Sequence, residues 1–245
     1  MERPQREDQL RKVAVRSSAP GKREAATAAR RPRRTRRTRD PTEKRARILS
    51  AARALFAEGG YLTTTTAVIA RRAGVSEGIV FHHFGSKAAV LEAVASEYGR
   101  GVAEAMFSAA PAQGAPPSAQ KMLRRAFAYV RQHGGLSRLL AVSADPSDSA
   151  AARRASRSAI VAALARGYRT WSQQGLMRAM DAQIVAELTY ALVEAALREC
   201  FVRGDGSREE DYLRETVRCV EGALQLAQPK PRSGGGRSRR RRKPI

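Results

Sequence analysis

The chain has few of the residues that build disulfide frameworks, membrane spans or stacked-aromatic sites. Its 245 residues include two cysteines, one tryptophan and only 5% aromatic residues. Two cysteines with no CxxC pair argue against a disulfide framework or a cysteine zinc site, so Cys200 and Cys219 are both predicted to be core thiols. No apolar run approaches the ~18 residues of a membrane span, and the N-terminus is charged rather than signal-like. We therefore expect a cytoplasmic protein.

Acidic residues are also scarce, since 23 Asp and Glu stand against 46 Lys and Arg, for a net charge of +23. Residues 1–40 carry +9 of this charge and residues 229–245 carry +8, which leaves +6 for residues 41–228. Charged segments with so little apolar content cannot offset chain entropy by burial. The two ends are therefore predicted to be a disordered basic N-terminal arm and a disordered basic C-terminal tail. A polyanion is their natural partner, and a solubilising tail or a cloning remnant is the alternative.

The sequence signatures of catalysis are missing as well. There is no P-loop, no nucleophile elbow and no dinucleotide fingerprint, and no carboxylate pair stands out from ordinary helix surface charge. We expect no catalytic residues, no cofactor and no enzymatic activity.

What the sequence does contain is helical periodicity from residue 41 to residue 228, with almost no strand signal. Asp40, Pro41 and Glu43 predict the start of the first helix as N-cap, first position and capping-box partner, and Ser207 with Glu210 predicts a second capping box. The pattern predicts an all-α fold of about nine helices, with no long-period repeat. The expected helices are a first one from 41 to the Gly59-Gly60 break, a second beginning near Thr64, and then 77–84, 87–107, 118–132, 136–142, 149–173, 182–203 and 208–227.

Residues 66–85 carry the pattern of a helix-turn-helix. Two helices that cross steeply need a small residue at their contact, a residue tolerant of positive φ in the turn, and an apolar residue facing the shared core. Ala70, Gly74 and Val80 fit these positions in order, and Ser76 is placed to cap the second helix. A corner in an ordinary helical bundle would explain the glycine but little else. Ile69, Ala73 and Val75 complete the expected apolar contact.

If the helix 77–84 enters a DNA major groove, its outward side chains should meet base edges. The predicted base-facing residues are Glu77, Gly78, Ile79, Phe81 and His82. Phosphate contacts are expected at the start of the preceding helix, from Thr64 and Thr65, because hydroxyls, backbone N–H groups and the helix dipole all favour an anion there. His83 and Lys87 are expected to hold the opposite flank.

The adjacent histidines His82 and His83 could suggest a metal site, but their geometry argues against one. Neighbouring residues on a helix point about 100° apart, and the third histidine, His133, belongs to another predicted helix with no cysteine pair nearby. No metal site is expected at His82 and His83.

Residues 43–94 resemble the DNA-binding domain of the tetracycline-repressor (TetR) family of bacterial transcription regulators. The resemblance rests on the IL-AA-LF first helix, the Gly-Tyr and Thr-Thr step, IA--AGVS-G, the H-F-SK ending and the following leucine, all in register. It implies an all-helical protein with a three-helix N-terminal DNA-binding domain, here 41–86, and a larger helical ligand-binding and dimerisation domain, here 87–228.

The resemblance also implies a DNA face and a mode of regulation. Members are usually homodimers joined through their last two long helices, and most repress until a small effector loosens DNA binding. Lys87 would be the phosphate clamp at the start of the fourth helix. This chain departs from the family at Phe81, where tyrosine is most common, so that hydroxyl contact to the DNA backbone is lost. The carried-over DNA-binding residues are Thr64, Thr65, Glu77, Gly78, Ile79, Phe81, His82, His83 and Lys87.

The predicted ligand-binding residues are aromatic or soft side chains on helices that surround the effector cavity in this architecture. Residues of these types are more often plain core than ligand contacts. The apolar faces of 182–203 and 208–227 fit an isologous four-helix interface, or packing within one subunit. The ligand candidates are Met122, Phe127, Tyr129, His133, Tyr168, Trp171 and Met177.

Together these patterns predict a homodimeric, sequence-specific, nucleoid-associated regulator that binds a palindromic operator in double-stranded DNA and is released by a small-molecule effector. The alternative is a sequence-independent nucleic-acid binder that acts mainly through its Arg-rich ends.

Overall fold

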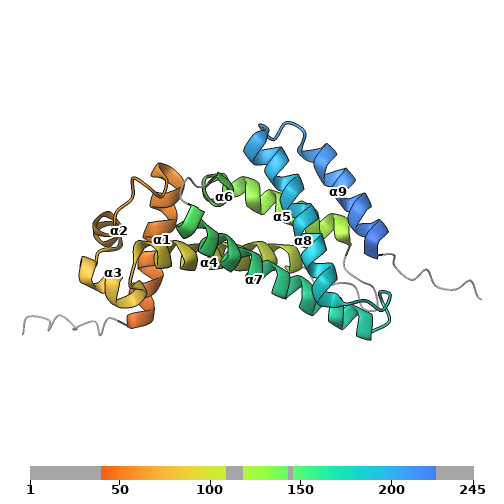
Figure 1. Cartoon of the computed structure of the whole chain (residues 1–245), viewed down its shortest axis with the longest axis horizontal. Helices are drawn as coiled ribbons and strands as arrows, with labels where there is room; N and C mark the ends of the chain where they lie inside the picture. Colours follow the sequence, from red (N-terminus) through yellow and green to blue (C-terminus); the bar gives the residue numbers. More distant parts are fainter. Residues whose placement is uncertain (1–39, 109–117, 143–145, 225–245) are drawn as a thin grey trace, which may run out of the picture. The chain divides into compact units, whose positions relative to one another are not determined.

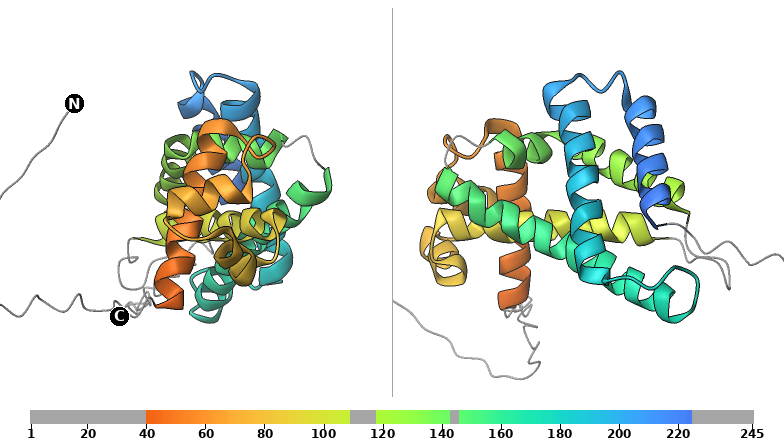
Figure 2. Two further views of the ribbon diagram at one scale, coloured as in Figure 1. Left: turned by 90° about the vertical axis from the view of Figure 1, so that its left-hand side faces the viewer. Right: turned by 45° about the vertical axis from the view of Figure 1, so that its right-hand side comes forward.

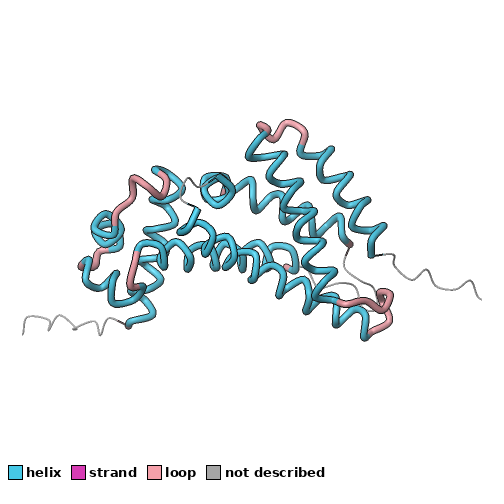
Figure 3. Tube along the Cα trace, viewed as in Figure 1, coloured by secondary structure: helices cyan, strands magenta, loops and turns pink. Residues whose placement is uncertain are grey.

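Helices make up almost all of the structure, a computed structural model that describes residues 40–108, 118–142 and 146–224; in that part of the chain no strand occurs (Figure 3). The predicted all-α fold is confirmed. The helices are α1 (Pro41–Gly59), α2 (Thr66–Ala73), α3 (Glu77–Phe84), α4 (Lys87–Phe107), α5 (Ala119–Gln132), α6 (Gly134–Val142), α7 (Pro146–Gln173), α8 (Ala182–Arg198) with a π-helical extension (Glu199–Arg203), and α9 (Glu209–Leu224).

Capping residues explain where the first helices begin and end. The Asp40 carboxylate accepts a hydrogen bond from the Thr42 N–H at 2.9 Å, and α1 ends at Gly60, whose φ of 82° an L side chain rarely adopts. The expected start of the second helix was two residues early. Thr65 is its N-cap, with its hydroxyl accepting from the Val68 N–H at 3.3 Å.

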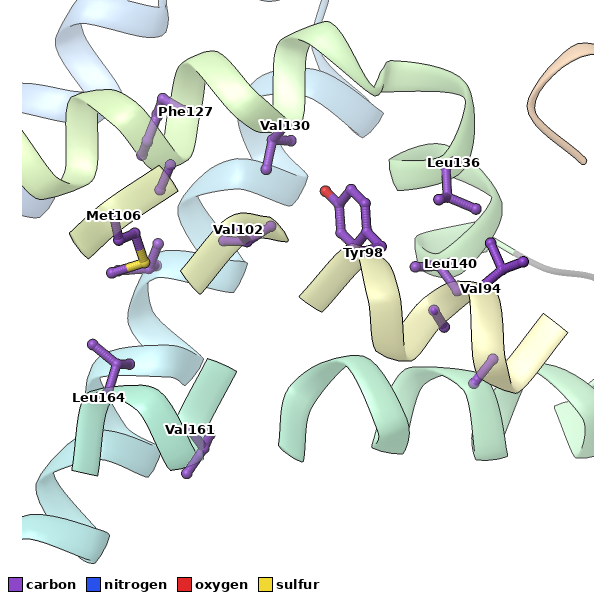
Figure 4. Packing of buried hydrophobic residues seen from close by; sticks show 14 of the residues in the cluster. Val94, Tyr98, Val102, Met106, Phe127, Val130, Leu136, Leu140, Val161 and Leu164 are labelled. Carbon is purple, nitrogen blue, oxygen red and sulfur yellow. The ribbon is translucent and has the colours of Figure 1, made fainter. Parts of the chain in front are cut away.

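The helices α1 to α3 lie together, and α4 leads from them to the remaining helices (Figure 1). α4 packs along α7, and its glycines allow a close approach. A Cβ on Gly99 would lie 2.4 Å from the Ser156 carbonyl oxygen, a distance that real Cβ atoms do not show. The row Tyr98, Val102 and Met106 on α4 faces the core between α5 and α7 (Figure 4).

The last two helices are antiparallel neighbours (Figure 2), and they dispose of their apolar faces differently. α9 buries Leu213, Val217, Val220 and Leu224 within the chain, where it packs on α5 and α8. α8 buries only part of its apolar surface. Ile184, Leu188 and Leu192 are 57%, 66% and 37% exposed at spacings of four residues, so they form one outward stripe, here called the α8 stripe.

Two details of the sequence reading were wrong in this region. Glu210 does not close a capping box on Ser207; its carboxylate pairs with Arg124 of α5 through contacts of 2.6 and 3.0 Å. Cys219 is not a core thiol, because it lies on the outer face of α9 and is exposed, whereas Cys200 is buried as predicted. The neighbours of Cys219 on that face, Arg218 and Gly222, are exposed as well.

The basic arm and tail, and residues 225–227 of the predicted last helix, lie outside the described residues. All the described residues belong to one compact unit. The division of this unit at residue 86 into a DNA-binding and a ligand-binding domain stays a prediction.

Candidate nucleic-acid interface and ligand cavities

A tight turn joins α2 to α3 and positions the candidate recognition helix. Gly74 adopts the left-handed conformation with φ 65° and ψ 40°, and the Val75 N–H donates to the Ala70 carbonyl at 3.0 Å. Ala70 and Val80 are 3% and 1% exposed where the two helices meet. The residues predicted to build the turn and its core are confirmed in these positions. Ser76 occupies the N-cap position of α3, although its hydroxyl makes no capping hydrogen bond.

The outward face of α3 carries four of the residues predicted to meet DNA bases. Glu77, Gly78 and His82 are exposed, and Phe81 is 47% exposed, which is unusual for a phenylalanine without a partner. Ile79 is half-buried and packs against the core, so its contribution to an outer surface is small. The Glu77 carboxylate also has a partner that the sequence did not indicate, since it accepts a hydrogen bond from the Thr66 hydroxyl of α2.

Gly78 stands in open space. A Cβ at this position would meet no atom within 4 Å, and its φ does not require glycine. Nothing inside the chain therefore explains a glycine in the first turn of α3, where it costs stability relative to alanine. A glycine of this kind is expected where a second molecule approaches the helix backbone closely.

The predicted phosphate contacts are placed unequally. Thr65 is exposed at the N-terminus of α2, where unpaired N–H groups favour an anion. Thr64 is 4% exposed and its hydroxyl donates to the Gly60 carbonyl at 2.8 Å, so its side chain is turned inward. Lys87 donates to the Tyr61 carbonyl at 3.1 Å and lies 4.1 Å from the centroid of that ring, which ties α4 to the loop after α1.

His83 is half-buried at the end of α3, and its ring lies against those of His82 and Phe84. Burial lowers the pKa of His83 below its ordinary value of 6.5, and positive charge on His82, Lys44 and Arg45 lowers it further. A nearby phosphate would act in the opposite direction, because an anion favours the charged imidazolium.

The predicted ligand-binding residues separate into two groups. Four of them line one cavity of about 250 Å³ between α4, α5, α7 and α9: Met122, Tyr168, Trp171 and Met177. Phe127 is fully buried core, with its ring 6.0 Å from that of Phe201. Tyr129 and His133 stack on each other at 4.1 Å on the α1 side of the helices, away from this cavity.

A second cavity, of about 140 Å³, was not predicted from the sequence. Its walls come from α4, α5, α6 and α7 and from the second half of α8 with its π-helical extension. Its polar lining residues include Tyr98, Arg153, Tyr190 and Arg198. Burial is the largest cause that raises the pKa of Tyr98 and of Tyr190 to about 12, so both phenols keep their protons at neutral pH. No sequence pattern marked these residues, because they meet only when α7 packs on α8.

Within the described residues, no cluster of three histidine, cysteine, aspartate or glutamate side chains could hold a metal ion. Nor does that part of the chain contain a helix with the length and apolar content of a membrane span.

A steep two-helix corner with an exposed second helix defines a helix-turn-helix protein. Residues 48–94 match the family model for bacterial regulatory proteins of the tetR family. The chain carries a tetR-family domain at these residues, which confirms the resemblance seen in its sequence.

Individual relatives agree with this assignment. The chain is 51% identical over 49 residues to the HTH-type transcriptional regulator HbdR of Aromatoleum sp., a match covering 20% of this chain and 21% of that protein. It is 42% identical over 64 residues to the HTH-type transcriptional repressor AcnR of Corynebacterium glutamicum, covering 26% and 34%. The matched segment thus spans only a fifth to a third of these curated relatives.

Solved structures extend the likeness to the fold of the longer chain. Salmonella enterica GusR superposes with a TM-score of 0.57 at 24% identity, covering 76% of this chain and 98% of that one. A TetR-family structure from Syntrophomonas wolfei reaches 0.62 at 15% identity, with 76% and 97% covered. At these identities the agreement concerns the fold alone.

Proposed function

We propose that this protein is a sequence-specific DNA-binding transcriptional regulator, a homodimeric repressor that a small effector releases from a palindromic operator in double-stranded DNA. The observation that carries the proposal is the outer face of α3, where an unexplained glycine, an exposed Phe81 and an exposed His82 lie side by side. Base reading in the major groove uses features of this kind. The glycine lets the backbone approach a base edge, Phe81 offers an apolar ring to a thymine methyl, and His82 offers a ring N–H donor.

Thr65 supports the same placement, because it sits where an α2 N-terminus would meet a phosphate. Lys87 joins it if DNA binding draws its ammonium group from the Tyr61 carbonyl to a phosphate. The Glu77 carboxylate can accept a hydrogen bond from cytosine N4 only if it gives up the one from the Thr66 hydroxyl. The loss of that bond reduces the free energy that Glu77 contributes to base discrimination.

The dimer is proposed to form through the α8 stripe. One eight-residue recognition helix reads few base pairs, and a two-fold partner doubles the site. Ile184, Leu188 and Leu192 form a contiguous exposed apolar stripe, and such patches often mark interaction sites. α9 contributes less apolar surface than the sequence suggested, because its apolar face is used within the chain.

Effector coupling is proposed to run through α4 and α6. α4 begins at Lys87, which is bonded to the loop after α1, and carries in its last turn Met106, which lines both cavities. In α6, Ser137 is bonded to the Tyr98 hydroxyl at 2.8 Å, and a Cβ on Gly135 would lie 2.7 Å from the Ala57 carbonyl of α1. A ligand that moves either helix therefore acts on α1 directly, which is the coupling that release requires.

The experiment that tests the proposal is selection from a pool of random duplexes by the full-length chain. The expected product is a two-fold symmetric motif with half-sites about one helical turn, ~34–36 Å, apart or a multiple of it. A pool that emerges without any enriched motif would instead favour a sequence-independent binder acting through the basic ends, which hold most of the net charge. A regulator of this kind belongs in the cytoplasm, on the nucleoid.

A further inference from the structure

The two cavities are neighbours and both are lined mainly by apolar side chains, but only the first has arginines in its lining. They share Met106, Leu164 and Thr189 as a common wall (Figure 4 shows Met106 and Leu164). Met106 is an unbranched thioether with several rotatable bonds, so a rotamer change withdraws its side chain from that wall. With that wall open, the two spaces would join into one chamber, which is the name used below for the pair.

The first cavity supplies a cationic end. Arg153 and Arg198 both line it, and in the described residues Arg153 has no carboxylate partner, only the Ser149 hydroxyl at 3.0 Å. Arg198 reaches Glu194 through a weak contact of 3.4 Å, while its Nε–H is buried with no acceptor among the described residues. A buried donor without an acceptor is costly, so this Nε–H is a place where an acceptor atom of a bound molecule would be stabilised.

The backbone next to Arg198 is also unusual. Directly after this residue α8 changes to a π-helix, Glu199–Arg203, and Leu197 and Val202 on either side of the change line the same cavity. π-helical turns are rare and occur frequently at functional sites. This feature is independent of the unpaired Nε and lies at the same place.

The second cavity supplies an apolar end. Met122, Leu123, Trp171 and Met177 form most of its wall, and Trp171 also contacts the rings of Phe107 and Tyr168 at 6.1 and 5.9 Å. Two volumes of about 140 and 250 Å³ that share one wall suit an extended chain crossing that wall better than one compact ring system.

We infer that the chamber binds an aliphatic carboxylate, with its carboxylate group between Arg153 and Arg198 and its unbranched tail passing Met106 to end beside Trp171. The inference deepens the proposed function, on which it rests, by naming the chemical class of the effector. Two guanidinium groups against one nearby carboxylate, Glu194, leave a net positive charge at the head position, which favours an anion over a neutral or cationic group.

Trp171 makes the inference directly testable, because it is the single tryptophan of the chain. The full-length protein is titrated, without DNA, with straight-chain carboxylates from octanoate to hexadecanoate, and in parallel with the alcohol and the amine of dodecyl length. Dodecanoate is expected to change Trp171 fluorescence saturably, and each added methylene to tighten binding about four-fold until the chamber is full.

The head group is tested with Arg153→Gln and Arg198→Gln, with Arg154→Gln as the matched control on the same helix. Each cavity variant is expected to weaken dodecanoate about ten-fold or more, while dodecanol binding and the control stay at wild-type values. Dodecanol binding as tightly as dodecanoate in the wild type, or dodecylamine binding tighter, overturns the inference.

The shared wall is tested with Met106→Phe, with Met106→Leu as the control of similar volume. The larger ring is expected to make affinity level off at a shorter acid. Affinity that does not depend on chain length in the wild type also overturns the inference, whether or not Met106→Phe folds. If dodecanoate binds as described but leaves the operator complex intact, the inferred binding site is supported and the proposal that this ligand releases the operator is contradicted.

Discussion

Gly78→Ala should move stability and DNA affinity in opposite directions. The added Cβ meets no atom within 4 Å in the free protein, and alanine loses less chain entropy than glycine in a helix. We expect the free energy of unfolding to rise by about 0.5–1 kcal/mol, or Tm by about 1–4 °C for a chain of this size. Against DNA the same methyl group occupies space that a base edge or sugar needs, and overpacking of this kind costs about 1–3 kcal/mol, roughly five- to a hundred-fold in Kd.

The assay pairs thermal unfolding with fluorescence anisotropy on a duplex recovered from the random pool. Gly134→Ala is the matched control, since a Cβ there also meets nothing within 4 Å but the residue begins α6. The control is expected to leave Kd unchanged. A Gly78→Ala protein with wild-type affinity would refute the close approach of DNA at α3, and a lowered Tm would refute the claim that the position is open.

Three further changes test other parts of the account. Phe81→Tyr adds a hydroxyl to a half-exposed ring. A hydrogen bond of about 0.5–1.5 kcal/mol from that hydroxyl to the DNA backbone should tighten operator binding about two- to ten-fold in anisotropy titrations. Weaker binding would show that the ring does not lie beside the DNA backbone. Leu188→Glu puts a charge in the α8 stripe and should give a monomer in sedimentation equilibrium with a near-wild-type circular dichroism spectrum, whereas an intact dimer would move the interface. The lowered pKa of His83 leaves its imidazole mostly neutral at pH 7, and a nearby phosphate raises that pKa. Operator affinity should therefore increase as pH falls from about 8 to about 6, and the increase should be smaller in His83→Gln. An equal increase in both proteins would assign the pH dependence to other groups.

The same pKa shift carries a cost for the free protein. The pKa of His83 is lower in the folded protein than in the unfolded chain, so the unfolded chain binds the proton more readily. Protonation below the unfolded pKa therefore favours unfolding. The contribution of His83 to stability is thus fully present above the unfolded pKa and lost as pH falls through it toward the folded one.

Local signals carried much of the fold. The recognition helix Glu77–Phe84 and α4, Lys87–Phe107, have the boundaries expected from their caps and glycines, because those signals act within a few residues. The start of α2 was missed by two residues, since a run of four threonines offers several equivalent caps and only the inward turn of Thr64 selects Thr65.

Features that depend on packing between distant helices were not readable. Glu194 and Arg198 have the spacing of an ordinary surface pair, and only the approach of α7 and the π-helical turn make that arginine part of a cavity. Phe127 and Trp171 look alike as aromatic positions on amphipathic helices, yet one is sealed core and the other lines an open chamber. The outward face of α3 was predicted well because the turn geometry leaves little choice of which side faces the core.

The central claim is that α3 reads DNA sequence, and the most direct measurement is the ratio of Kd values for a scrambled duplex and for the duplex enriched from the random pool. For the full-length protein at physiological salt, we expect this ratio to be about a thousand or more. A ratio near one would contradict it and leave the basic ends as the source of binding.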